Sequence, residues 1–128
     1  FSSLDAAYAP CFIDTADGHH YLSVGDIQGR VEVLDIESGH SVKQWKHADS
    51  YAVASAYSHG VLAIGSSSSR MLKLYAVSKG FECFYSKTFS NTSIQGLHLT
   101  ADLQYLTVAD GGGKDQCTVL RIANDVKG

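Results

Sequence analysis

The chain repeats one pattern of short apolar runs with a period of about forty residues, and this repeat limits the folds open to it. One run occurs as VLDI at 33–36, LYAV at 74–77 and VLRI at 119–122. A second run precedes each of these, as YLSVG at 21–25, VLAIG at 61–65 and YLTVA at 105–109. Because the two series keep step, the chain consists of three copies of one structural unit.

Two further runs complete the unit. A run that ends in a polar turn opens each copy, at 8–13, 51–57 and 94–99, and a fourth run follows in the first two copies, at 41–47 and 82–89. The chain ends at 124–128, where the fourth run of the third copy would begin. The runs are short and rich in β-branched and aromatic residues, the turns between them are typical of hairpins, and no stretch has a helical stripe. We predict a meander of four strands per unit.

Such a unit is too small to cover both faces of its own sheet. It therefore has to stack on neighbours of the same kind, and radial stacking about a central channel is the propeller solution. Alternation along the third strand places Val31 and Val33 on one face, while Leu34 and Ile36 pack against an adjacent blade. The predicted fold is all-β, a β-propeller fragment of four-stranded antiparallel blades. A β-sandwich or another meander is the alternative, which the period disfavours.

The motifs of the first unit resemble those of the WD-repeat family. They are TADG at 15–18, LSVGD at 22–26, QGR at 28–30, VEVLD at 31–35 and KH at 46–47. The resemblance runs from about Tyr8 onward and implies one partial propeller domain over 1–128. Its blade units are about 7–47, 51–89 and 93–128, the last without its fourth strand.

The resemblance also implies a buried network of His, Asp, Ser or Thr, and Trp in each blade. His47 takes the place of the histidine for the second blade. Ser67 or Ser68 occupies the region of the aspartate and Tyr75 the position of the tryptophan, so the network is not expected in its usual form. Leu34 and Leu120 replace the tryptophan in the other units.

Composition excludes several classes of function. With 45% hydrophobic and 18% charged residues the chain is globular, and a net charge of -3 gives no basic field for nucleic acid. No apolar run approaches the roughly 20 residues that span a bilayer, and no signal peptide opens the chain. We expect no membrane insertion and an intracellular location, in the cytoplasm or the nucleus. Cys11, Cys83 and Cys117 are isolated, and we expect small buried side chains in a reducing compartment.

Candidate chemical sites are weak. Adjacent His19 and His20 point to opposite sides of a strand or turn, without a third ligand at metal spacing. The glycines at 111–113 lack the spacing of a phosphate loop, and the serines at 66–69 could be phosphorylated or simply form a turn. Trp45 is expected to pack between blades, with an exposed partner anchor as the alternative. We predict no catalytic residue, no metal, no cofactor and no enzyme.

The resemblance implies a scaffold for protein–protein interaction, in a larger protein or a multi-subunit complex. Its partners would meet the loops before the first and third strands, where we expect Asp26, Tyr51, Arg70, Lys114 and Asp115 to make contacts. Two whole units and three strands are too few for a closed ring, so we expect missing sequence or a partner chain to supply the other blades. The alternatives are an architectural fragment that completes another chain's ring, and a ligand-binding or enzymatic propeller.

Overall fold

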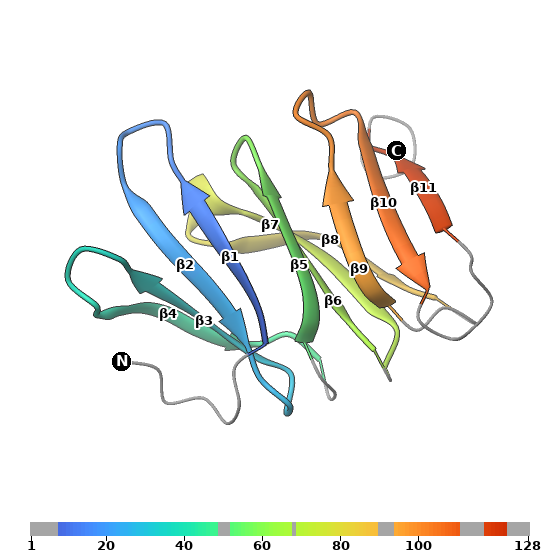
Figure 1. Cartoon of the computed structure of the whole chain (residues 1–128), viewed down its shortest axis with the longest axis horizontal. Coiled ribbons are helices and arrows are strands. Elements are labelled where there is room, and N and C mark those ends of the chain that lie inside the picture. The colour runs from blue at the N-terminus through green and yellow to red at the C-terminus, as the bar shows by residue number, and fades with distance from the viewer. Residues whose placement is uncertain (1–7, 49–51, 68, 90–93, 111–116, 123–128) are drawn as a thin grey trace.

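Three antiparallel sheets stand side by side in the computed structural model, which describes residues 8–48, 52–67, 69–89, 94–110 and 117–122 (Figure 1). The first sheet has the order β1-β2-β3-β4, the second β5-β6-β7-β8 and the third β11-β10-β9. The strands are β1 Tyr8–Asp14, β2 His20–Gly25, β3 Arg30–Asp35, β4 Ser41–Lys46, β5 Ala52–Ser58, β6 Val61–Ser66, β7 Met71–Ala76, β8 Glu82–Thr88, β9 Ile94–Leu99, β10 Tyr105–Asp110 and β11 Cys117–Arg121. The prediction of an all-β meander is confirmed.

Each copy of the sequence repeat forms one sheet. The third strands of the three sheets, β3, β7 and β11, are the three copies of the run that defines the period, and each pairs with the strand before it. The first strands, β1, β5 and β9, lie next to one another along one side of the array (Figure 1). Among the described residues the only helix is a single 3-10 turn at Val77–Lys79.

The hairpin turns of the first and third sheets are built alike. At the end of β1 the Thr15 hydroxyl donates to the Asp17 carboxylate and accepts the His19 amide at 3.1 Å. At the end of β9 the Thr100 hydroxyl donates to Asp102 at 2.7 Å and accepts the Tyr105 amide at 3.1 Å. A threonine followed two residues later by an aspartate thus closes the same turn twice, because both short side chains can satisfy nearby backbone groups.

Both faces of the second sheet are covered along β6 and β7, whereas its outer strand β8 is largely exposed. One face packs on the first sheet and the other on the third, so the middle unit is apolar on both sides, as the stacking argument requires. The layer between the first and second units contains Ile13, Val31, Val33, Leu62, Ile64, Tyr75, Val77 and Phe81. The layer between the second and third units contains Ala54, Ala63, Leu72, Leu74, Phe89, Ile94, Leu99, Leu106, Val108, Leu120 and Ile122.

Gly65 lets the second and third sheets approach closely. A Cβ atom at this position would lie 2.5 Å from Cγ2 of Ile94, a fully buried side chain. Gly65→Ala should therefore lower the free energy of unfolding by about 1 to 3 kcal/mol, measured by chemical denaturation. Gly96→Ala is the matched control, since its Cβ would meet Ala109 at an ordinary 3.4 Å. Equal stability of the two variants would contradict close packing at Gly65.

Two expectations about burial are wrong. Cys83 and Cys117 are exposed and only Cys11 is partly buried, because β8 and β11 are outer strands whose side chains meet fewer neighbours. Ile36 is 44% exposed and Leu34 only half-buried, since the described chain has no sheet on that side of β3. Among the residues that the structure describes, no helix is long and apolar enough to cross a membrane.

Candidate functional site

Asp26 organises the turn between β2 and β3 and has no exposed surface. One carboxylate oxygen accepts the backbone amides of Gln28 at 2.9 Å and Arg30 at 2.8 Å, and the other accepts Nε of Arg30 at 2.8 Å. These bonds to the charged form hold the pKa of Asp26 below its usual value, although burial alone would raise it. The Asp26 carboxylate is fully buried in this chain and shapes the turn, and its contact with a partner stays a prediction.

Arg70 occupies the corresponding turn of the second sheet, between β6 and β7. Its amide donates to the Ser67 carbonyl at 3.2 Å, and its carbonyl accepts the Phe89 amide at 2.9 Å. Gly29 makes the same two bonds in the first sheet. Its amide donates to the Asp26 carbonyl at 3.2 Å, and its carbonyl accepts the His47 amide at 2.7 Å. Ser67 therefore stands at the aspartate position.

The Arg70 side chain belongs to the loop surface that the sequence indicates. Arg70 is exposed, and its Nε donates to the Phe89 carbonyl at 2.9 Å. Ser66 in the same turn is fully buried and bonds to Ser69 at 2.6 Å, so a kinase could reach Ser66 only after the turn opened. Tyr51, Lys114 and Asp115, and the glycines at 111–113, lie outside the described residues.

A buried hydrogen bond joins the end of the first unit to the third strand of the second. His47 Nδ1 lies 2.8 Å from the Tyr75 hydroxyl, and His47 Nε2 lies 3.2 Å from the Met71 carbonyl. Because a carbonyl can only accept, Nε2 carries the proton and Nδ1 accepts from Tyr75. Tyr75 at the tryptophan position still bonds the histidine, while no hydrogen bond among the described residues links His47 to Ser67 at the aspartate position, so the network departs from its usual form as expected.

Burial keeps this pair neutral. It lowers the pKa of His47 to about 4, helped by the positive charge of Lys73 and opposed by the hydrogen bond to Met71. Burial likewise raises the pKa of the Tyr75 hydroxyl. Neither group is placed to exchange protons with a substrate, and the pair instead fixes the register between two blades.

Trp45 packs between blades as predicted. Its ring centroid is 5.0 Å from that of Tyr75 and 5.7 Å from that of Phe81, and the side chain is half-buried. The interface between the first and second units therefore ends in an aromatic cluster on the side of their outer strands, β4 and β8.

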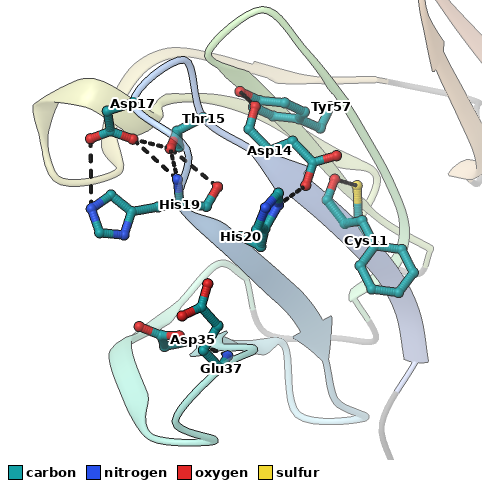
Figure 2. A network of polar contacts seen from close by, with 10 residues as sticks. Cys11, Asp14, Thr15, Asp17, His19, His20, Asp35, Glu37 and Tyr57 are labelled. Atoms are coloured by element: carbon teal, nitrogen blue, oxygen red, sulfur yellow. Dashed lines mark hydrogen bonds and ion pairs between the residues drawn. The ribbon is translucent and has the colours of Figure 1, made fainter.

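The β1–β2 hairpin lies at the other end of the strands from the Asp26 and Arg70 turns, and it carries a network of polar contacts (Figure 2). His20 Nδ1 donates to the Asp14 carboxylate at 2.6 Å, which raises the pKa of His20. His19 Nε2 lies 3.8 Å from Asp17, and the bond from Thr15 lowers the pKa of that carboxyl. The two histidines pair with different carboxylates, so they do not converge on one ion.

A hollow of about 1030 Å³ lies beside this network, between the first and second units. The β1–β2 hairpin, the β5–β6 hairpin and the turn between β7 and β8 line it. Sequence reasoning missed this groove because its walls come from three turns of two repeats. Within the described ranges no group of three His, Cys, Asp or Glu side chains could hold a metal ion.

Comparison with solved structures defines the fold. A chain in a crystal structure of the mitotic checkpoint complex matches 90% of this chain with a TM-score of 0.74 and 20% identity. The β-propeller domain of Cps50 (Swd1) from Myceliophteria thermophila matches 98% of it with a TM-score of 0.73 and 15% identity. No protein-family model and no curated protein matches the sequence.

The three sheets are thus part of a β-propeller, similar in structure to WD40 propellers, and the predicted fold class is confirmed. The chain spans 34% and 39% of the two chains that it matches. At these identities the similarity concerns the fold alone.

Proposed function

We propose that the chain is a segment of a protein–protein interaction scaffold without catalytic activity, whose ring is completed by further blades. The observation that carries this proposal is the uncovered apolar face of the first sheet. Phe12 is 68% exposed and Ile36 44% exposed, and with Leu22 and Leu34 they line a hollow of about 360 Å³. Contiguous apolar surface of this kind is typical of a protein interface.

A buried acidic group limits how far the uncovered face extends. Glu32 stands opposite Val24 and Gln44 in the first sheet, on the strand face away from the second sheet. Only 3% of Glu32 is exposed, and its Oε1 has no hydrogen-bond partner among the described residues. A buried acceptor without a donor is costly. Because Glu32 and Val24 are already buried, the uncovered part of this face is the part around Phe12 and Ile36.

The blades that cover this face come either from further sequence of the same protein or from another chain of a complex. In the second case the segment is architectural and completes another subunit's ring. Co-expression with candidate partner chains separates the two, because only the architectural segment needs another chain to become soluble. The unpaired cysteines, two of them exposed, support an intracellular site, in the cytoplasm or the nucleus.

Replacing the two most exposed apolar side chains tests the uncovered face. The 128-residue chain alone should self-associate in analytical ultracentrifugation, and the double variant Phe12→Ser and Ile36→Ser should shift it toward monomer, because less apolar surface is then left in water. Phe84→Ser is the matched control, since Phe84 is also 44% exposed but lies on β8 of the middle sheet, away from the uncovered face of the first sheet. A monodisperse, cooperatively folded monomer without substitution would contradict the proposal.

A further inference from the structure

The hollow between the first and second units has aromatic walls. Tyr21 from β2, Tyr57 from β5 and Phe81 from the turn before β8 line it, and the rings of Tyr21 and Phe81 meet edge to face at 6.5 Å. Val42 and Val77 add aliphatic surface. A groove of this size and character matches the sites that bury small ligands or single side chains of a peptide.

Two carboxylates and one histidine, His59, are the acidic and basic side chains among the described residues that line the groove. Asp14 and Asp17 stand on the β1–β2 hairpin, and neither lysine nor arginine is among the lining residues. On the side of the β7–β8 turn, Lys43 Nζ donates to the carbonyl of Gly80, a lining residue, at 2.7 Å. The hairpin side of the groove is therefore acidic.

The acidic side is held in place by one bond that crosses between the two units and a second bond within the second unit. The Tyr57 hydroxyl donates to the Asp14 carbonyl at 3.3 Å and accepts the Gly60 amide at 3.1 Å. Figure 2 shows Tyr57 next to Asp14, with the His20 ring on the carboxylate and Thr15 on Asp17. A ligand that met these groups would not have to order them first, which reduces the entropic cost of binding.

We propose that this groove binds a peptide segment through an arginine side chain. A guanidinium stacks on aromatic rings and presents a planar fork of donors to carboxylates, so it meets both kinds of wall at once. Lysine would offer only a point charge, and an acidic or purely apolar segment would bring no charge opposite to that of the two carboxylates, which now pair with His20 and His19. The inference goes beyond the scaffold function, because the groove lies at the edge opposite the Asp26 and Arg70 turns.

The test compares two capped pentapeptides, Gly-Leu-Arg-Leu-Gly and Gly-Leu-Gln-Leu-Gly, by NMR titration of the complete protein at pH 7.5. The arginine peptide should bind about tenfold more tightly than the glutamine peptide, as expected for one cation–π contact and one surface ion pair together. Its binding should move the resonances of Tyr21 and Tyr57 and should weaken as salt is added.

The double variant Asp14→Asn and Asp17→Asn should abolish the preference for the arginine peptide. Asp102→Asn is the matched control, because Asp102 closes the same kind of turn in the third sheet and does not line the groove. Circular dichroism establishes that both variants keep the sheets. Equal binding of the two peptides, shifts outside the groove, or an unchanged preference in the double variant would each overturn the proposal. None of these results would decide whether the opposite loops bind a partner.

Discussion

Lowering the pH from 7 to 4 is expected to reduce the free energy of unfolding by about 3 kcal/mol through His47 alone. Burial lowers the pKa of His47 to about 4 in the folded chain, against about 6.5 for an ordinary histidine. The unfolded chain therefore binds more protons than the folded chain between these values. The contribution of neutral His47 is complete above pH 6.5 and is lost progressively as the pH falls toward 4.

Other groups titrate differently and can be told apart. The raised pKa of His20 acts in the opposite direction, but its side chain is exposed and its effect on stability is small. The lowered pKa of Asp26 gives stability that is lost only below about pH 4, outside the His47 window. The loss between pH 6.5 and pH 4 therefore reports mainly on His47.

Chemical denaturation at a series of pH values measures this loss. His47→Gln cannot titrate, so it should be less stable than the unsubstituted chain at pH 7 but should show a much flatter dependence between pH 6.5 and 4. If that variant does not fold, NMR titration of the His47 ring in the unsubstituted protein still decides. Protonation with a midpoint near 6.5 would contradict the buried neutral state.

The same histidine shows what the sequence could predict. Its place at the end of the first unit follows from the period of about forty, and the resemblance to WD repeats places Tyr75 at the tryptophan position. The bond between them was not predictable, because it depends on how two sheets set two side chains 28 residues apart. A tyrosine hydroxyl and a tryptophan indole differ in shape as donors. Only the packed structure shows that the Tyr75 hydroxyl reaches Nδ1 of His47.

Local chemistry was predictable where neighbours in the sequence decide it. The turn at Thr15 and Asp17 needs only short side chains and adjacent amides, and the structure has it. Exposure of Cys83 and Cys117 could not be predicted the same way, because it depends on which strands are outermost and which faces another sheet covers. The groove depends likewise on turns of two repeats, and no local pattern in either repeat marks it.

Leu74→Ala is expected to lower the free energy of unfolding by about 2 to 5 kcal/mol. Leu74 is fully buried in the layer between the second and third units, flanked in register by Ala63 and Tyr85. Two terms make up this decrease in stability: the lost transfer free energy of the removed methyl and methylene groups, and the cost of the cavity that they leave. Neighbouring strands cannot move to close the cavity, because backbone hydrogen bonds hold these strands in place. The shift of the midpoint in chemical denaturation measures it.

Phe12→Ala is the informative counterpart. Phe12 is larger than Leu74, but it is 68% exposed on the uncovered face of the first sheet. In the 128-residue chain alone its truncation should change stability by no more than about 0.5 kcal/mol, as for most surface substitutions. In the complete ring the same change should cost about 3 to 5 kcal/mol, because a further blade would then bury the ring as the second sheet buries Ile13. An equally small effect in both contexts would mean that no blade covers this face, and the proposed completion of the ring would be wrong.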